Sequence, residues 1–160
     1  MFERFTKDAR AAVGEASQVA RDRGAATVEA EHILLAITNG NSRAARVLHD
    51  AGLGSDGLSA ALAAETTRSL AAVGVTADAL QFSPFVQTPK FGNSAKLVLE
   101  RALRVSVARR DKDIGAEHLV LAALRAPTGT VPRALECAGV DRVELTASVE
   151  RAADAAPPSR

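Results

Sequence analysis

Apolar residues recur three and four positions apart through most of the chain, which is the pattern of amphipathic helices. The first stripe is expected to end near Gly24, and a second helix is expected to begin around Glu29 and stop at Asn39-Gly40-Asn41. Alternation typical of a strand is not visible. The remaining helices are expected near residues 42–51, 55–70, 92–110, 116–125, 131–138 and 141–153.

The chain also contains an internal repeat. Residues 5–32 align without gaps with residues 91–118, so that Ala30-Glu31-His32 meets Ala116-Glu117-His118. Chance helical periodicity would not keep such a triplet in register, which indicates a duplicated unit. The sequence therefore predicts an all-α fold of two pseudo-symmetric four-helix repeats, about eight helices in total, packed as one domain.

The repeat sets the expected organisation of the chain. The first unit is expected over residues 1–71, a linker loop over 72–90, the second unit over 91–153 and a frayed tail over 154–160. The linker carries Phe82 and Phe85, which either dock on the core or help to form a binding patch.

Composition and charge narrow the partners. Apolar residues make up 47% of the chain and aromatic residues 3%, so an aliphatic core is expected. The formal net charge of +1 gives no strong field toward nucleic acid or an anionic membrane. Neither a signal peptide nor an apolar run of about 20 residues is visible. A cytoplasmic protein with no nucleic-acid or membrane partner is expected.

A search for catalytic motifs returns nothing. A phosphate-binding G-x-x-x-x-G-K-[ST] loop and a G-x-S-x-G turn are both missing from the sequence. Cys137 lies in an apolar helical pattern without a histidine partner and is expected to be a buried thiol. We therefore expect no enzyme and no cofactor.

Two histidines and one charged run are the remaining candidates for binding features. His32 and His118 each follow a glutamate, but adjacent helical residues point about 100° apart, so a shared metal is not expected. Structural histidines at helix starts are expected instead. The run Arg109-Arg110-Asp111-Lys112 is expected to be a solvated helix end.

Four segments carry a resemblance to a known family. Residues 1–10 (MFERFTKDAR), 31–36 (EHILLA), 91–100 (FGNSAKLVLE) and 115–120 (GAEHLV) resemble the N-terminal repeat domain of Clp-type protein unfoldases, with the C-type unfoldases of actinobacteria as the nearest form. The resemblance covers about residues 1–153. It implies a non-catalytic domain that receives protein substrates or adaptors, either as part of a longer unfoldase or as a free-standing paralogue.

The resemblance also implies phosphoarginine binding, with one site in each unit. Thr6 and Glu31 match the family pattern in the first unit, whereas in the second Glu117 matches and Gly92 replaces the threonine. Glu29-Ala30 replaces the usual Gly-Thr and adds a negative charge. Because Gly92 lacks the threonine hydroxyl in the second unit, the Glu31 site is expected to be the stronger one. The alternative is that Glu31 and Glu117 are ordinary first-turn residues.

A groove for cyclic-peptide antibiotics is the second implied site. Its matching positions are Phe2, Arg10, Val13, Phe91, Lys96, Leu99, Glu100 and Leu103. Gly14 replaces a bulkier aliphatic residue of the family and could reshape the groove. The alternative is that Val13, Leu99 and Leu103 are core residues between the units. A protein that sequesters such antibiotics is the alternative function.

Overall fold

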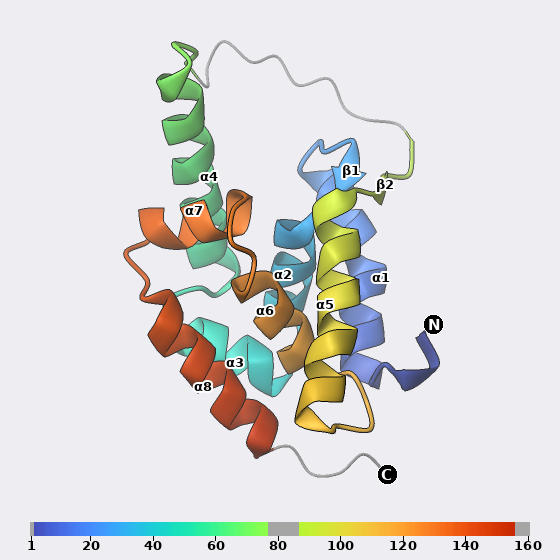
Figure 1. The fold of residues 1–160 in the computed structure, drawn as a ribbon. Helices are drawn as coiled ribbons and strands as arrows, with labels where there is room; N and C mark the ends of the chain where they lie inside the picture. Colours follow the sequence, from blue (N-terminus) through green and yellow to red (C-terminus); the bar gives the residue numbers. More distant parts are fainter. Residues whose placement is uncertain (1, 77–86, 156–160) are drawn as a thin grey trace.

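The computed structural model describes residues 2–76 and 87–155, and its helices form two four-helix units around a shared interior (Figure 1). A 3-10 turn, η1 (Phe2–Arg4), precedes the first helix. The eight helices are α1 (Lys7–Asp22), α2 (Ala30–Asn39), α3 (Arg43–Asp50), α4 (Ser55–Ala72), α5 (Asn93–Arg109), α6 (Ala116–Leu124), α7 (Thr130–Cys137) and α8 (Arg142–Asp154). This architecture confirms the predicted all-α fold.

Short side chains define where several helices begin. Thr6 accepts a hydrogen bond from the backbone N–H of Ala9 and caps α1, and Ser42 caps α3 in the same way. Asp141 caps α8. Helix α5 differs, because its N-cap residue is Gly92, which has no side chain to offer.

One element was not predicted, a parallel pair of two-residue strands, β1 (Thr27–Val28) and β2 (Lys90–Phe91). Strands of two residues are too short to leave an alternating pattern in the sequence. A matching parallel bridge joins Phe5 to Ile114. Since Phe5 is the repeat equivalent of Phe91 and Val28 that of Ile114, the two bridges are pseudo-symmetric copies of one contact.

These bridges exchange segments between the units. The residues before α1 pair with the loop before α6, and the residues before α5 pair with the loop before α2. Backbone hydrogen bonds continue the exchange from Thr6 N to Ile114 O (3.0 Å) and from Gly92 N to Val28 O (2.8 Å). Each unit is therefore completed by the other.

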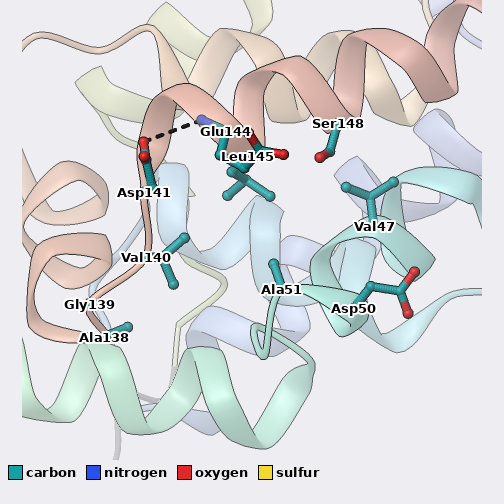
Figure 2. A pocket seen from close by; sticks show the side chains of 10 residues that line it. All are labelled: Val47, Asp50, Ala51, Ala138, Gly139, Val140, Asp141, Glu144, Leu145 and Ser148. Atoms are coloured by element: carbon teal, nitrogen blue, oxygen red, sulfur yellow. Dashed lines mark hydrogen bonds between the residues drawn. The ribbon is translucent and has the colours of Figure 1, made fainter.

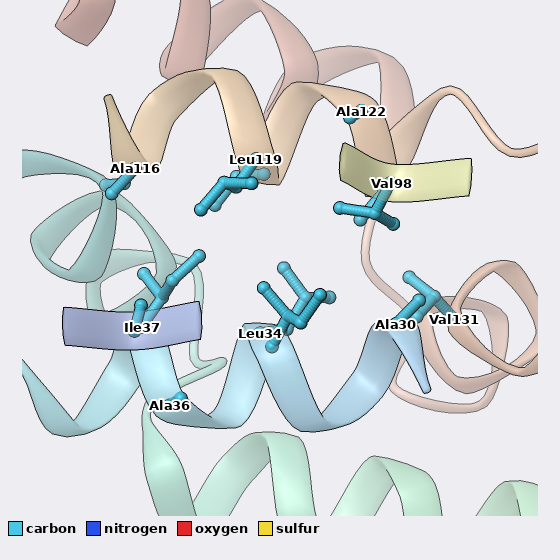
Figure 3. Packing of buried hydrophobic residues seen from close by; sticks show 14 of the residues in the cluster. Ala30, Leu34, Ala36, Ile37, Val98, Ala116, Leu119, Ala122 and Val131 are labelled. Carbon is cyan, nitrogen blue, oxygen red and sulfur yellow. The ribbon is translucent and has the colours of Figure 1, made fainter. Parts of the chain in front are cut away.

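The core lies between α2 and α6, the repeat-equivalent helices at the centre of the molecule (Figure 3). Leu34 and Ile37 of α2 face Leu119 of α6 across it. Several core residues of these two helices have no exposed surface: Ile33, Leu119, Val120, Leu121 and Ala122. Helices buried on almost every side, as these two are, fit only at the centre of a bundle.

Two expectations, the bounds of the linker and the burial of Cys137, need correction. Ala72 belongs to α4 and Lys90 to β2, so the connection between the units is shorter than residues 72–90. Phe82 and Phe85 lie outside the described residues. Cys137 is half-buried rather than buried. It is the last residue of α7, and its Sγ lies 4.0 Å from Nη1 of Arg68.

Candidate binding sites

The segment exchange decides which predicted residues meet. Thr6 pairs with Ile114 and so lies at the start of α6, the helix of Glu117. Gly92 pairs with Val28 at the start of α2, the helix of Glu31. The expected pairing of Thr6 with Glu31 within one unit is therefore wrong, because the segment before each first helix crosses to the other unit.

Two corners follow from this arrangement. The α5 corner comprises Glu29, Ala30, Glu31, Gly92 and Ser94. The α1 corner comprises their repeat equivalents Gly115, Ala116, Glu117, Thr6 and Asp8. The two corners have the same backbone plan and different side chains.

In the α5 corner, the carboxylate of Glu29 lies at the N-terminus of α5. Its Oε2 accepts hydrogen bonds from the backbone N–H of Ser94 (3.2 Å) and from the Ser94 hydroxyl. Its Oε1 accepts one from the Thr27 hydroxyl (2.8 Å), and Ser94 Oγ accepts one from the N–H of Ala30 (2.9 Å). Glu29 thereby caps a helix 65 positions away in the sequence.

Charge and space in this corner agree with that capping role. Partial burial opposes ionisation of Glu29, but hydrogen bonds from Ser94 and Thr27 outweigh it and lower the pKa of this carboxyl. A Cβ at residue 92 would collide with Oε1 of Glu29. Glycine at 92 and glutamate at 29 are therefore one combined feature. Sequence reasoning missed this capping role of Glu29, although the lost side-chain cap at Gly92 was visible.

Glu31 lies beside this cap, at the border of a cavity of about 320 Å³. Burial raises the pKa of Glu31, and the nearby charges of Glu29 and Glu65 raise it further. The hydrogen bond from its own backbone N–H lowers the pKa but does not outweigh them. In residues 2–76 and 87–155 no other side chain donates a hydrogen bond to it. The rest of the lining comes from α5 and from the loop between α6 and α7, including Leu97, Arg101, Pro127, Val131 and Arg133.

The α1 corner has no carboxylate where the α5 corner has Glu29, because the equivalent residue is Gly115. The cavity at the equivalent position measures about 70 Å³ and is lined by Asp8, Ala11, Ala12, Glu15, Ala116 and the turn after α2. The side chain of Thr6 caps its own helix. The two corners therefore differ in volume and in what occupies the helix N-terminus.

Both predicted structural histidines are confirmed. His32 and His118 are about 5% and 6% exposed, and each Nδ1 accepts a backbone N–H, from Glu29 (2.8 Å) and Gly115 (2.9 Å). The pKa of His32 is lowered to about 4, mainly by burial and further by the positive charge of Arg23, while the charge of Glu29 acts in the opposite direction. Asp111 Oδ2 lies 2.9 Å from Nε2 of His118.

The predicted groove is divided by the structure. One cavity of about 270 Å³ is lined by four of the predicted residues, Lys96, Leu99, Glu100 and Leu103. Its other lining residues, Arg4, Phe5 and Ile114, were not predicted. This lining is mostly apolar. The contribution of Arg4, Phe5 and Ile114 depends on the exchanged bridge and could not be found from either unit alone.

The other groove candidates lie elsewhere. Phe91 belongs to β2, which pairs beyond the C-terminal end of α1, whereas Phe2 precedes the N-terminal end of this 16-residue helix (Figure 1). Val13 is a core residue and Arg10 is exposed. Phe2 is 42% exposed and packs edge-on against Phe5, with ring centroids 5.1 Å apart. Gly14 has open space around it.

A cavity of about 460 Å³ is a separate feature between α3 and the start of α8 (Figure 2). Val47, Val140 and Leu145 form its apolar wall, and Asp50 and Asp141 its acidic rim. None of the predicted site residues lines it. Asp141 is engaged in capping α8, as the dashed line in Figure 2 shows.

The charged run after α5 is more than a solvated end, which corrects the prediction. Arg109 contacts Asp111 (2.9 Å) and Asp154 of α8 (2.6 Å), and its side chain is 20% exposed. The carbonyls of Asp111 and Lys112 accept hydrogen bonds from Arg4. The run therefore joins the N-terminal segment, α5 and α8.

No group of three or more His, Cys, Asp or Glu side chains could hold a metal ion in residues 2–76 and 87–155. None of the helices described there has the length and apolarity to cross a membrane.

Comparison with protein families gives a match over nearly the whole chain. The family described as the Clp repeat (R) N-terminal domain matches residues 4–88 and again residues 90–160. The two matches correspond to two copies of one repeat.

Curated relatives and solved structures agree with this match. The chain is 34% identical over 152 residues to the chaperone protein ClpC1, chloroplastic, of Arabidopsis thaliana, and 32% identical over 153 residues to a ClpA homologue of Cyanidium caldarium. The matched region makes up 94% of this chain and 15–16% of the length of these two relatives. The N-terminal domain of ClpD from Arabidopsis thaliana superposes with a TM-score of 0.72 at 21% identity, covering 96% of this chain and 97% of that one. The Hsp104 N-terminal domain from Candida albicans gives 0.65 at 17%, covering 92% and 89%.

Proposed function

Because the chain belongs to the Clp repeat (R) N-terminal domain family, we propose that it is a non-catalytic module that binds protein substrates or adaptors of a Clp unfoldase. The observation that supports this most is the apolar cavity between the N-terminal segment and α5. Phe2 and Leu103, which are 42% and 43% exposed, extend the apolar surface of this region. Large apolar side chains left in water beside a cavity are typical of a binding surface.

The charges at the cavity rim favour a polypeptide ligand. Lys96 and Glu100 both line it, and Glu100 is held by Arg104 at 2.5 Å. Apolar walls with charged groups of both signs at the rim resemble a small protein interface. The proposed partner is therefore an extended or unfolded segment that inserts an apolar side chain between Phe5 and Leu103.

Fluorescence anisotropy with labelled casein, an unfolded polypeptide, tests this function. We expect Phe2→Ala and Leu103→Ala to weaken binding at least about tenfold, since each removes a large apolar contact. Val107→Ala is the matched control, because Val107 is on α5, is 60% exposed and does not line the cavity. Equal affinity of all three variants and the unaltered protein would refute the cavity as the binding site.

Sequestration of cyclic-peptide antibiotics is the second candidate function, favoured by the apolar lining of the same cavity. A cyclic-peptide Clp inhibitor should then bind much more tightly than casein in a calorimetric titration. Leu99→Ala and Leu103→Ala should weaken it while Val107→Ala should not. Weak or undetectable binding of the inhibitor would exclude this function and leave the polypeptide-binding module.

Phosphoarginine reading stays a proposal, and the geometry reverses its expected asymmetry. Glu29 fills the α5 N-terminus from the other unit beside Glu31, whereas the α1 N-terminus near Glu117 is capped by its own Thr6 and has Asp8 in its first turn. Titration with free phosphoarginine should therefore show a loss in Glu117→Gln and little change in Glu31→Gln. A loss in Glu31→Gln alone would restore the first-unit site predicted from sequence.

A further inference from the structure

The two corners have the same backbone plan but different side chains and cavities, so a comparison shows what is specific to the α5 corner. The α1 corner encloses about 70 Å³ and the α5 corner about 320 Å³. The loop between α6 and α7 borders the larger cavity and contains Pro127, Thr128 and Gly129. It also holds the single-residue insertion that shifts the repeat register after this point. The larger space is a property of the second unit's own sequence.

The larger cavity already contains an anion at the place where an anionic ligand would be held. The N-terminus of a helix attracts negative charge through its free N–H groups and its dipole. At α5 the Glu29 carboxylate occupies that place, bonded to the N–H and the hydroxyl of Ser94. A second anion there would lose these donors and would be repelled by Glu29.

The second carboxylate, Glu31, has no such partners. The pKa of Glu31 is raised by its burial and by the charges of Glu29 and Glu65, which outweigh its own backbone N–H and the charge of Arg23, so its ionised form is disfavoured in the protein alone. A positive group near Glu31 would relieve this cost. Geometry makes the same point, because Glu31 borders an open cavity and accepts no hydrogen bond from another side chain in residues 2–76 and 87–155.

The basic residues around the cavity leave this cation requirement in place. Arg133 also lines it, but its Nε contacts the buried carboxylate of Glu65 at 2.8 Å. Arg101 lines it on the α5 side and contributes one positive charge against those of Glu29 and Glu31. Leu97 and Val131 supply apolar walls for an aliphatic stem. Apolar walls with an acidic end suit a long basic side chain.

We propose that the α5 corner is a site for an unmodified basic side chain, Arg or Lys, of a bound polypeptide, and that Glu29 excludes phosphorylated forms of that side chain. The proposal rests on the proposed function, because it names the polypeptide feature that this second cavity takes. Glu31 pairs with the guanidinium or ammonium group, and the stem lies along Leu97 and Val131. Glu29 acts as a built-in anion that closes the helix N-terminus to phosphate.

Three labelled peptides test the proposal by fluorescence anisotropy. They share one short sequence with leucines on both sides of a central residue, which is arginine, citrulline or phosphoarginine. Citrulline has the shape of arginine without its charge. We expect the arginine peptide to bind at least about tenfold more tightly than either of the others, as a charged hydrogen-bonded pair requires.

Two variants assign the effect to single carboxylates. Glu31→Gln should remove the preference for arginine over citrulline, while the matched control Glu117→Gln in the other corner should keep it. Glu29→Ala should improve binding of the phosphoarginine peptide at least about tenfold, because it frees the donors of Ser94. Thermal unfolding of each variant confirms that it is folded.

The outcomes separate this proposal from the proposed function. An arginine preference that survives Glu31→Gln, or Glu29→Ala without any gain for phosphoarginine, would overturn the α5 site. Casein binding that still depends on Phe2 and Leu103 would then leave the proposed function intact. If the unaltered protein binds neither casein nor any of the three peptides, both proposals fail.

Discussion

The α5 corner and the α1 corner began as the same piece of structure and now hold different groups. At α5 the helix N-terminus is capped from the other unit by Glu29, and the space beside it is open. At α1 the helix is capped by its own Thr6, and the space is nearly closed. The comparison shows how a duplicated scaffold can change a site without changing a helix.

Two substitutions account for the difference in capping. With Gly92 in place of Thr6 and Glu29 in place of Gly115, the cap comes from a residue of the other unit instead of from the helix's own N-cap residue. Each change alone would leave either a collision or an uncapped helix. The pair therefore acts as a unit, and the predictions below test the comparison through it.

The largest expected effect concerns the core that both corners share. Ile33 and Leu119 are repeat equivalents with no exposed surface. Ile33→Ala or Leu119→Ala should each lower the free energy of unfolding by about 2–5 kcal/mol, since each leaves a cavity in a close-packed interior. Urea titration followed by circular dichroism should show one transition in both variants. Two transitions would mean that the units, and so the corners, fold separately.

A pH effect on stability should arise from His32. The pKa of His32 is lowered from 6.5 to about 4, so between these values the unfolded chain binds a proton that the folded protein does not. The free energy of unfolding should therefore fall as the pH drops from about 6.5 to 4, by up to about 3 kcal/mol.

Substitution assigns this pH effect. Asparagine at position 32 can accept the same N–H bond from Glu29 without titrating, so His32→Asn should flatten the slope in urea titrations across this pH range. His118→Asn, which removes the contact between Nε2 of His118 and Asp111, is the equivalent variant for comparison. An unchanged slope in His32→Asn would show that another group is responsible.

Features that repeat locally could be predicted from the sequence, whereas contacts between the two units could not. Helix periodicity and the Glu-His triplets were visible because they repeat locally, and the core helices followed from them. The segment exchange was invisible, because strands of two residues have no periodicity and their partners lie in the other unit. The pairing of Thr6 and the role of Glu29 both depend on that exchange. The corners could therefore be located from the sequence but not assembled.

The coupled pair at α5 is expected to have a smaller effect than the core. Gly92→Ala should displace Glu29 and lower the free energy of unfolding by about 1–2 kcal/mol, roughly the contribution of a lost helix cap. Gly115→Ala is the matched control. There the added Cβ would lie 2.7 Å from Oε2 of Glu117, the mobile end of a side chain, so the cost should be lower.

A double substitution sharpens this test. In Glu29→Ala the collision with residue 92 is gone, so adding Gly92→Ala should cost less than it does in the unaltered protein. Thermal unfolding of the four proteins of this cycle measures the coupling. Additive losses would mean that Gly92 and Glu29 are independent and that the cap did not change as a unit.

The smallest expected effect has the opposite sign. Because the pKa of Glu31 is raised in the folded protein, its ionised form is less stable there than in the unfolded chain. Glu31→Gln should therefore raise the free energy of unfolding, by less than about 1 kcal/mol, and Glu117→Gln is the control. The gain should shrink as the pH falls toward the pKa of Glu31, where the carboxyl is already neutral. A stabilising substitution that also removes the preference for arginine would show that Glu31 is retained for binding at a cost in stability. A destabilising one would show instead that the Glu31 carboxylate supports the fold.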